Sequence, residues 1–367
     1  MTDRECFEAV LHGKTPERIP WTPRLNIWYE YHKANHSLPD PYKKMDMEGL
    51  RKNLNAGRSV RNGRIFNIDY TQSRLSTVKT NDGFMNIIEN SKGVITESYA
   101  SSGKNAGTAI KPARMEFFLK DKNDYDVMIE HIRSMRYTPC FEEYQAYDCE
   151  IGDDALPLCI IGDVPATTII RDYIGYNDGY FHLSDFDEKF EDLLFTFDKA
   201  LEAMHEILLK SPAKLFLHGM HFDSQMTPPP FFKQYILPYY KKLTPRTRNA
   251  GKYIAIHQDG DAFHLVDLIA ESGIDVADCL CTDPMAQLTL EKAYDAWRDK
   301  VVIWGGIPSI ILNPDSCSEH VFLEFAGLAV DLAKSGHMLL SVSDNVMPEA
   351  DIERVRIISE MLKKVQL

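Results

Sequence analysis

The segment Lys252–Asp261, with the sequence KYIAIHQDGD, joins an apolar strand pattern to polar residues and a glycine. Alternate residues of a strand project to the same face of a sheet, so we expect His257 and Asp259 to point in the same direction. An imidazole and a carboxylate that converge at a strand end can bind zinc or another divalent metal. They can equally form an acid/base pair, or a hydrogen bond that only closes the strand. The segment therefore indicates both a strand and a candidate site.

Short apolar strands and amphipathic helices alternate along residues 151–367. Such alternation is typical of a parallel sheet, and its length and the polar strand ends favour a closed barrel over an open sheet. We therefore predict an α/β fold, a (β/α)8 TIM barrel, in a single domain that spans residues 1–367. The expected strands cover residues 156–161, 214–217, 253–256, 276–280, 301–304 and 338–341, and the expected helices cover residues 186–209, 230–250, 262–272, 289–298, 317–335 and 349–364.

Residues 1–150 are predicted to form an N-terminal elaboration that includes the first strand of the barrel. Thr2 and Gly13 are suitable residues for the start and the end of a short helix, and a strand is expected at residues 21–25. Further along, Asn81-Asp82-Gly83 and Ser91-Lys92-Gly93 are hairpin turn signals between β-branched and aromatic residues. We therefore expect a helical segment and antiparallel hairpins before the regular βα repeats begin.

The composition excludes several classes of function. Of the 367 residues, 44% are hydrophobic and 26% are charged, as in a globular protein with a large core. The formal net charge of -13 disfavours nucleic acid and anionic membranes as partners, because both attract clustered Lys and Arg. No apolar run approaches the roughly 20 residues of a membrane span. Seven cysteines without a signal-peptide pattern indicate reduced thiols, so we expect a cytoplasmic protein, and the composition is compatible with an oligomer.

Catalytic groups of TIM barrels gather at the carboxyl ends of the strands, and polar residues follow several of the expected strands here. Cys279 and Cys281 would share one strand face, which suits two thiolate ligands, although buried packing is the commoner role of such cysteines. Asp344 follows the last expected strand, where it could reach the barrel mouth or form an Asx turn. The metal-ligand candidates are His257, Asp259 and Asp344, with Asp278 and Cys281 as weaker ones.

Two further groups of residues are candidates for the chemistry and for the substrate. His218, His221 and Asp223 follow the expected strand at 214–217, and each is a candidate acid or base, with an ordinary hydrogen bond as its alternative. Aromatic residues after the first strand could line an apolar pocket or belong to the core. No Gly-x-Ser-x-Gly motif supports a serine hydrolase. The substrate-binding candidates are Asn26, Trp28, Tyr29 and Asp163.

The segment Thr227–Lys242, with the sequence TPPPFFKQYILPYYKK, resembles the SPxxFxEYxLPYxKK segment of the uroporphyrinogen decarboxylase-like superfamily. The resemblance continues through the strand that ends at His257, through Lys300–Pro308 and through the opening Arg4–Pro20, so it covers nearly the whole chain. It implies a (β/α)8 barrel, in agreement with the alternation of strands and helices.

The resemblance also distinguishes two branches of the superfamily. Uroporphyrinogen decarboxylases carry an Arg-Gln-Ala-Gly-Arg-Tyr loop whose arginines hold substrate propionates, whereas the corresponding Arg24–Tyr31 has one arginine and several aromatic residues. Corrinoid-linked methyltransferases hold zinc with a His-x-Cys pair and a later Cys. Here His257-Gln258-Asp259 and Ser343-Asp344-Asn345 fall at those positions, so carboxylates replace both thiolates. A harder set of nitrogen and oxygen ligands suits the polarisation of an oxygen atom.

The resemblance therefore implies an O-demethylating methyltransferase, which moves methyl from an aryl methyl ether to the cob(I)alamin of a separate corrinoid protein. Zinc or another divalent metal is the expected cofactor. A phenolate of pKa about 10 is a mediocre leaving group, so its oxygen needs a Lewis acid or a proton, which the metal or a histidine would supply. Aromatic side chains would hold a small aromatic methyl donor. The alternatives are a decarboxylase-type lyase with a smaller substrate and a barrel that only binds a small molecule.

Overall fold

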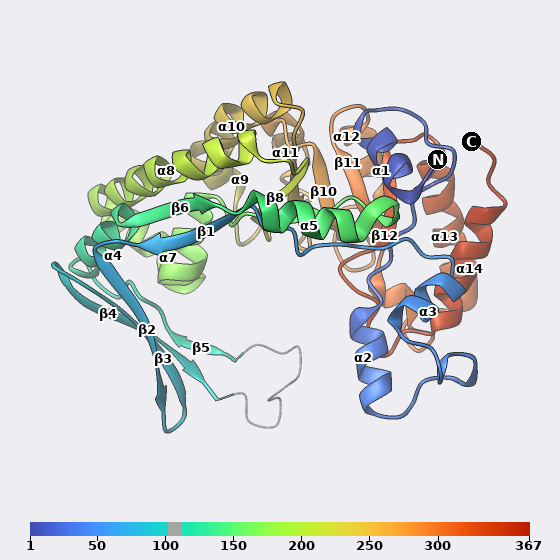
Figure 1. Cartoon of the computed structure of the whole chain (residues 1–367), viewed down its shortest axis with the longest axis horizontal. Coiled ribbons are helices and arrows are strands. Elements are labelled where there is room, and N and C mark those ends of the chain that lie inside the picture. Colours follow the sequence, from blue (N-terminus) through green and yellow to red (C-terminus); the bar gives the residue numbers. More distant parts are fainter. Residues whose placement is uncertain (102–111) are drawn as a thin grey trace. The chain divides into compact units, whose positions relative to one another are not determined.

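The computed structural model describes residues 1–101 and 112–367 (Figure 1). Internal contacts divide the chain into two compact units. The first, which we call the barrel unit, comprises residues 1–64, 142–162 and 212–367. The second comprises residues 65–141 and 163–211. Residues 1–367 were predicted to form one domain, and the residues of the second unit are two insertions into the chain of the barrel unit.

A six-stranded parallel sheet forms the centre of the barrel unit (Figure 1). Nearly every residue of these strands is buried, as expected for a parallel sheet covered on both faces. All six strands overlap the strands expected from the apolar runs, so the α/β prediction is confirmed. In their order across the sheet they are β7 (Leu158–Ile160), β8 (Leu215–Met220), β9 (Tyr253–His257), β10 (Val276–Leu280), β11 (Val302–Ile307) and β12 (Met338–Val342).

Two extended segments continue this sheet at its edges. A parallel bridge joins Trp21 to Leu340 of β12, and another joins Gly63 to Cys159 of β7. The backbone N–H of Gly57, just before the second segment, donates to the carbonyl of Trp21 at 2.6 Å, so the two segments meet. They occupy the places of the first two strands of a (β/α)8 barrel, next to the six strands that follow.

The strand expected at residues 21–25 is thus reduced to a single bridge. Thr22 donates its N–H to the carbonyl of Leu340 at 3.0 Å, and Leu340 donates to the carbonyl of Pro20 at 2.9 Å. The ladder extends no further because Pro20 and Pro23 flank the bridge, and proline has no N–H to donate. The first position of the barrel is therefore held by few backbone hydrogen bonds.

Helices of the barrel unit begin at side-chain caps in several places. Thr2 forms a capping box with Glu5 at the start of the first helix, and Thr289, Ser318 and Asp351 cap later ones. The helices are α1 (Asp3–Leu11), α2 (Asn26–Ala34), η1 (Asp40–Tyr42), α3 (Met47–Asn53), α5 (Phe141–Ile151), η3 (Gly152–Asp154), α9 (Pro229–Phe231), η5 (Phe232–Ile236), α10 (Leu237–Asn249), α11 (Val266–Ser272), α12 (Leu290–Trp297), η6 (Ser309–Leu312), α13 (Glu319–Ala333) and α14 (Ile352–Lys363).

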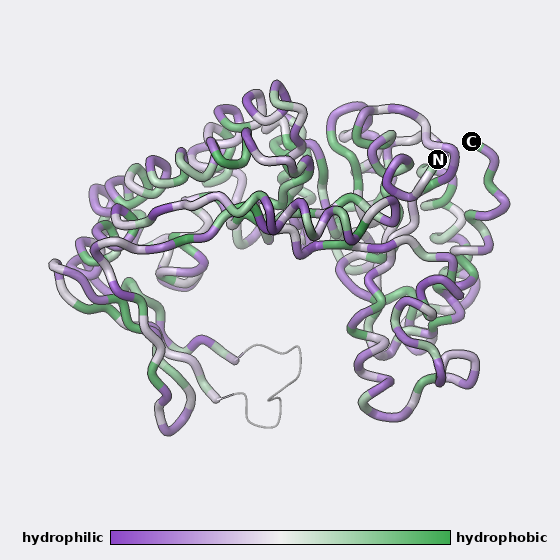
Figure 2. The backbone as a smooth tube through the Cα atoms, viewed as in Figure 1, coloured by the Kyte–Doolittle hydropathy of each residue, from purple (hydrophilic) through white to green (hydrophobic). Residues whose placement is uncertain are grey.

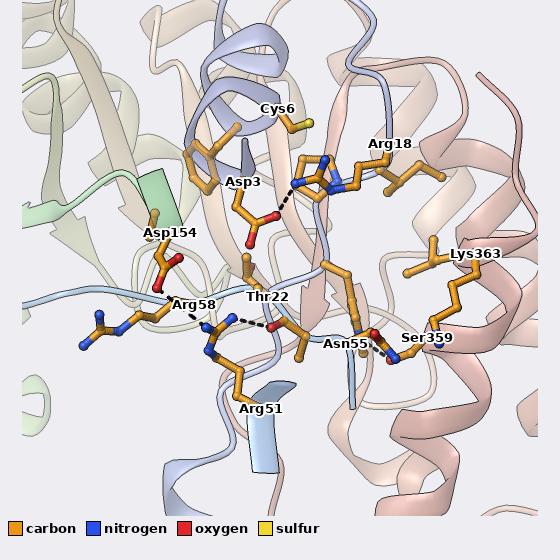
Figure 3. A pocket seen from close by; sticks show the side chains of 18 of the residues that line it. Asp3, Cys6, Arg18, Thr22, Arg51, Asn55, Arg58, Asp154, Ser359 and Lys363 are labelled. Carbon is orange, nitrogen blue, oxygen red and sulfur yellow. Dashed lines mark hydrogen bonds and ion pairs between the residues drawn. The ribbon is translucent and has the colours of Figure 1, made fainter. Parts of the chain in front are cut away.

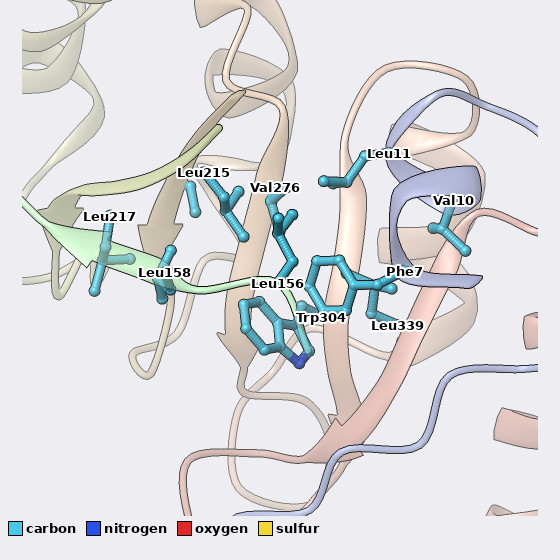
Figure 4. Packing of buried hydrophobic residues seen from close by; sticks show 11 residues of the cluster. Phe7, Val10, Leu11, Leu156, Leu158, Leu215, Leu217, Val276, Trp304 and Leu339 are labelled. Atoms are coloured by element: carbon cyan, nitrogen blue, oxygen red, sulfur yellow. The ribbon is translucent and has the colours of Figure 1, made fainter. Parts of the chain in front are cut away.

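Apolar side chains from the strands and from α1 fill the barrel interior (Figure 4). Phe7 of α1 meets Trp304 of β11 edge to face, with 5.0 Å between the ring centroids. Because three residues of α1 share this cluster with Val276, the first residue of β10, α1 covers the amino end of the barrel. The opposite end, where the strands terminate, is left for polar groups. The cluster contains Phe7, Val10, Leu11, Leu156, Leu158, Leu215, Leu217, Ala255, Val276, Trp304 and Leu339.

The second unit contains an antiparallel sheet, as the turn signals predicted. Its hairpins turn at residues 81–82 and 91–92. Helix α4 packs against β3 and β4, on the face of the sheet where Ile88 and Ile95 are buried. Hydrophilic and hydrophobic residues alternate along its longest helix, α8 (Figure 2). The elements are β1 (Phe66–Tyr70), β2 (Ser73–Thr80), β3 (Gly83–Asn90), β4 (Gly93–Ala100), β5 (Arg114–Glu116), α4 (Asp124–Arg133), β6 (Met135–Pro139), α6 (Pro165–Thr168), η4 (Ile169–Ile174), α7 (Tyr176–Asp185) and α8 (Asp187–Lys210).

None of the helices in the described residues has the length and apolar character that crossing a bilayer requires.

Candidate metal centre

Three side chains from different strands converge at the carboxyl end of the barrel. His257 is the last residue of β9, Cys279 lies in β10, and Asp344 follows β12. Their ligand atoms, a nitrogen, a sulfur and an oxygen, all lie within 4.8 Å of one another. We call these three residues the polar cluster. His257 and Asp344 were predicted as metal ligands from the sequence, whereas Cys279 was considered there but not chosen.

An irregularity in β10 brings Cys279 into the polar cluster. The pairing of β10 with β11 shifts register between Asp278 and Leu280, and Cys279 has a positive φ of 59°. This bulge interrupts the alternation that would otherwise place Cys279 and Cys281 on one face. Cys281 is buried and outside the cluster, and burial together with nearby carboxylates raises its pKa to about 11. The structure therefore brings Cys279, and not Cys281, to His257.

Backbone strain is concentrated around the polar cluster. Cys279, Asp344 and the neighbouring His221 have φ values of 59°, 60° and 59°. The left-handed region costs a residue with a side chain on the order of 1–3 kcal/mol, and such residues tend to cluster at active and ligand-binding sites. Each of the three lies at or near the end of a barrel strand, so the strained backbone turns polar side chains towards one place.

The imidazole of His257 is oriented by carboxylates on both sides. Its Nδ1 lies 3.2 Å from Oδ2 of Asp278, and its Nε2 lies 3.6 Å from Asp259 and 3.7 Å from Asp344. Burial lowers the pKa of His257, but interactions with Asp259, Asp278 and Cys279 outweigh burial and raise it to about 12. In the neutral form that metal binding requires, Nδ1–H donates to Asp278 and Nε2 faces the polar cluster. A carboxylate behind a histidine is the usual support of a histidine metal ligand.

Asp278 is itself held by a buried arginine. Its two carboxylate oxygens each accept a hydrogen bond of 2.5 Å from Arg61, and the side chains of Asp278 and Arg61 are only 1% and 14% exposed. Burial raises the pKa of Asp278, but Arg61 and His257 hold it well below its usual value. The guanidinium of Arg61 also stacks over the Trp304 ring, 4.8 Å from its centroid. Asp278, a weaker metal candidate from sequence, thus lies behind His257 as its support.

A second arginine contacts the other two members of the polar cluster. Arg24 donates to Oδ1 of Asp344 at 2.5 Å and lies 3.7 Å from the sulfur of Cys279. Arg61 lies 3.8 Å from the same sulfur. The resemblance segment contained Arg24, but no sequence signal assigned it to a carboxylate more than three hundred residues later, at a separation of 320. Arg61 had no signal at all.

The donor set fits a zinc-like ion in spacing. Ligand atoms around tetrahedral zinc, with bonds of 2.0–2.3 Å, lie roughly 3.3–3.8 Å apart. Here Nε2 of His257 is 3.7 Å and the sulfur of Cys279 is 3.9 Å from Oδ1 of Asp344. Small adjustments of these side chains would bring all three atoms to one ion. Asp259, whose carboxylate is 3.6 Å from His257, is within reach as a further ligand.

The donor set also fits a divalent ion in charge. With Cys279 as thiolate, the cluster and its neighbours Asp259 and Asp278 carry four negative charges. Arg24 and Arg61 supply two positive charges. The remaining two negative charges match one divalent cation, and neutral histidine, thiolate and carboxylate are the forms that bind metal.

The three predicted acid/base residues occupy different environments. His221 is 46% exposed at its side chain and its Nδ1 lies 2.6 Å from Asp259, with its ring 5.6 Å from that of His257. His218 is fully buried, where Nε2 contacts the hydroxyl of Tyr239 at 2.7 Å. Burial lowers the pKa of His218 to about 4. Of these two histidines, His221 is the one beside the polar cluster.

Asp223 has a structural environment. Its carboxylate accepts backbone N–H groups of Gln225, Met226 and Asp261 at 2.8, 3.2 and 2.9 Å. These bonds tie the loop after β8 to the loop after β9. Asp223 therefore holds these two loops together near the site.

Three of the predicted substrate residues lie on α2. Trp28 and Tyr29 are 1% and 3% exposed, and their polar atoms donate to the carbonyls of Ala350 and Met45 at 3.0 Å each. Asn26 is exposed at the start of α2. Asp163 belongs to the second unit, where it accepts a hydrogen bond from Arg171 at 2.6 Å. Trp28 and Tyr29 pack in the core because they lie on the buried face of α2.

Comparisons with known proteins agree with this architecture. Residues 188–365 match the model of the family described as uroporphyrinogen decarboxylase (URO-D). The matched segment contains β8 to β12 and all three residues of the polar cluster, and the match agrees with the superfamily inferred from sequence. A solved structure, "methyltransferase from Methanosarcina mazei", is similar with a TM-score of 0.52 and 13% sequence identity over 99% of each chain. No curated protein sequence matches the chain.

Proposed function

We propose that the protein is a methyltransferase that moves a methyl group from a methylated donor, an aryl methyl ether, to the cob(I)alamin of a partner corrinoid protein. One observation carries the proposal: nitrogen, sulfur and oxygen donors converge within 4.8 Å at the carboxyl end of a barrel that includes the segment matched by the URO-D family model. The methyltransferase with a similar fold supports the choice of this branch over the decarboxylases.

His257, Cys279 and Asp344 would hold zinc or another divalent metal, with Asp259 as a further ligand. Bound there, the metal would supply Lewis acidity towards the leaving oxygen of the donor. One thiolate beside oxygen and nitrogen donors makes a harder site than two or more thiolates. This ligand set is better suited to an oxygen leaving group than to activation of a thiol.

The remaining groups of the site would fix the ligands and move a proton. Arg61 and Asp278 fix the ring of His257, and Arg24 fixes the carboxylate of Asp344. The methyl group passes to cobalt(I), whose electron pair forms the new bond, while the electrons of the broken C–O bond stay on the phenolate oxygen. His221, held by Asp259, is the group we assign to protonate that oxygen.

The decarboxylase-type alternative needs cationic side chains that are available for a substrate carboxylate. Arg24 and Arg61, the arginines at the polar cluster, already pair with Asp344 and Asp278 at 2.5 Å. Both arginines are therefore neutralised within the protein, which favours the methyltransferase over the lyase. Metal dependence distinguishes the two functions, because the lyase needs no metal.

The test is methyl transfer by the full chain loaded with zinc, using a panel of aryl methyl ethers, methylamines, methylthiols and methanol. Cob(I)alamin, free or on a corrinoid protein, changes its visible spectrum when it is methylated. We expect activity with an aryl methyl ether, loss of activity in Cys279→Ala, and normal activity in Cys149→Ala, whose cysteine is exposed. No spectral change with any donor, or full activity after removal of metal, would contradict the proposal.

A further inference from the structure

A concave site lies at the opposite end of the barrel from the polar cluster. A cavity of about 510 Å³ is bounded by α1, the first barrel segment, the residues after α3, η3 and α14 (Figure 3). Pro20 precedes the bridge at Trp21, Arg58 precedes the bridge at Gly63, and Asp154 precedes β7. The cavity is therefore at the amino ends of the strands, within the barrel unit. Its volume is within the range of small-molecule sites, about 300–1,000 Å³.

The cavity is cationic in a protein that is otherwise acidic. Among the described residues, five lining side chains are Lys or Arg and two are Asp, whereas the whole chain has a net charge of -13. Figure 3 shows that these side chains come from separate segments around the opening. The five cationic residues are Arg18, Arg51, Lys52, Arg58 and Lys363, and the two acidic residues are Asp3 and Asp154.

Carboxylates neutralise four of the five cations to different extents. Arg18 pairs with Asp3 at 2.5 Å, and Lys363 pairs with Glu360 at 2.7 Å. Arg51 and Lys52 share Glu48, at 2.5 and 3.3 Å, and Asp154 is 3.7 Å from Arg51. The five cations, including Arg58, and these four carboxylates sum to one net positive charge. An oxyanion would balance this charge.

Arg58 is the cation that is not paired internally. Within residues 1–101 and 112–367, its guanidinium makes no hydrogen bond or ion pair, and its residue is only partly exposed. Nearby Arg51 is fixed by Glu48 and by the carbonyl of Ala56 at 2.7 Å, with 11% of its side chain exposed. A fixed guanidinium beside an unpaired one is a suitable arrangement for a carboxylate or phosphate, which arginine binds through paired hydrogen bonds.

Another part of the cavity wall is apolar, beside the polar side chains of Thr22, Asn55 and Ser359. Phe7, Ile19, Trp21, Leu362 and Val365 contribute to it. We infer that the cavity binds a small organic anion with an aromatic or aliphatic body and one carboxylate or phosphate group, and that Arg58 pairs with the anionic group. The amino end of a TIM barrel is not its catalytic end, so the ligand is a second bound molecule and not the methyl donor.

Phenyl phosphate is a suitable probe because it combines an aromatic body with a phosphate group. Calorimetric titration of the full chain, freed of metal with EDTA and at low salt, would measure its affinity beside that of inorganic phosphate and of phenol. We expect one saturable site for phenyl phosphate, weaker binding of inorganic phosphate and none of phenol. Arg58→Gln should lower the affinity for phenyl phosphate by about tenfold or more. The reason is that a hydrogen bond to a charged group contributes on the order of 1.5–3 kcal/mol, and 1.4 kcal/mol corresponds to a tenfold change in affinity.

Two control variants exclude other binding modes. Arg74→Gln removes the same charge from β2 of the second unit and should leave the affinity unchanged. His257→Ala removes one member of the polar cluster and should also leave the affinity for phenyl phosphate unchanged. Absence of saturable binding, or equal affinity of the wild type and Arg58→Gln for phenyl phosphate, would overturn the inference. Equal losses of affinity in Arg58→Gln and Arg74→Gln, or loss of binding in His257→Ala, would overturn it as well.

Discussion

Asp278→Asn is expected to destabilise the barrel unit far more than the loss of an equally short ion pair at the surface. The carboxylate of Asp278 is 1% exposed and pairs with Arg61, which is 14% exposed, through two contacts of 2.5 Å. Removing one partner of a buried pair leaves an uncompensated charge and typically costs about 3–5 kcal/mol. We expect a loss of that order in the free energy of unfolding.

The matched control is Asp331→Asn. Asp331 also pairs at 2.5 Å, with Lys334, but the two side chains are 70% and 47% exposed. Exposed pairs contribute roughly 0–1 kcal/mol because water screens them, so this variant should unfold almost like the wild type. The two substitutions make the same chemical change and differ in burial.

Urea denaturation followed by tryptophan fluorescence is the assay. The protein has four tryptophans, at positions 21, 28, 297 and 304, and all lie in the barrel unit, so the signal reports that unit. EDTA in the buffer separates the ion pair from any effect of bound metal. Arg61→Met/Asp278→Asn should recover part of the loss, because it removes the charge that the single variant leaves unpaired. Equal destabilisation by Asp278→Asn and Asp331→Asn, or strictly additive losses in the double variant, would refute the reasoning.

Three further outcomes are expected. His257→Ala and Cys279→Ala should each bind less zinc, measured by elemental analysis, while their circular-dichroism spectra stay unchanged. The control Cys281→Ala should keep its zinc. Retention of zinc by Cys279→Ala would contradict the assigned ligand set. His221→Ala should slow demethylation by about 10²–10⁴-fold without loss of metal, and the defect should shrink for donors with more acidic phenols; a defect independent of phenol acidity would exclude proton donation. Burial lowers the pKa of His218 from its ordinary value of 6.5 to about 4, so the unfolded state binds more protons in this pH range. Stability should therefore fall as pH falls from 6.5 to 4, by on the order of 3 kcal/mol. In His218→Gln the melting temperature should depend less on pH, and an equal dependence would contradict this origin.

The sequence predicted the elements whose signal is local. β9 and β10 were found within one residue of their ends, because a strand buried on both faces appears as an uninterrupted apolar run. The hairpin turns before Gly83 and Gly93 were found because turn residues carry their own conformational preference. His257 was placed at a strand end by the same local pattern.

Features that depend on distant residues or on irregular backbone were not predicted. The bulge at Cys279 reverses which cysteine faces His257, and no alternation rule signals a bulge. Arg61 meets Asp278 across a separation of 217 residues, so its role is determined by tertiary structure alone. Trp28 was a pocket candidate because an aromatic residue near a strand end has the same sequence signature whether it faces the core or a ligand.

Trp304 has a consequence for how this site could change during evolution. Its ring contacts Phe7 of α1 and the guanidinium of Arg61. Arg61 binds Asp278, and Asp278 in turn binds His257. The position of the imidazole is therefore fixed by a packed column that stands on the closed end of the barrel. The loops that follow the strands are not part of this column. They can exchange sequence and length, and with them the molecules they admit, while the histidine remains in place.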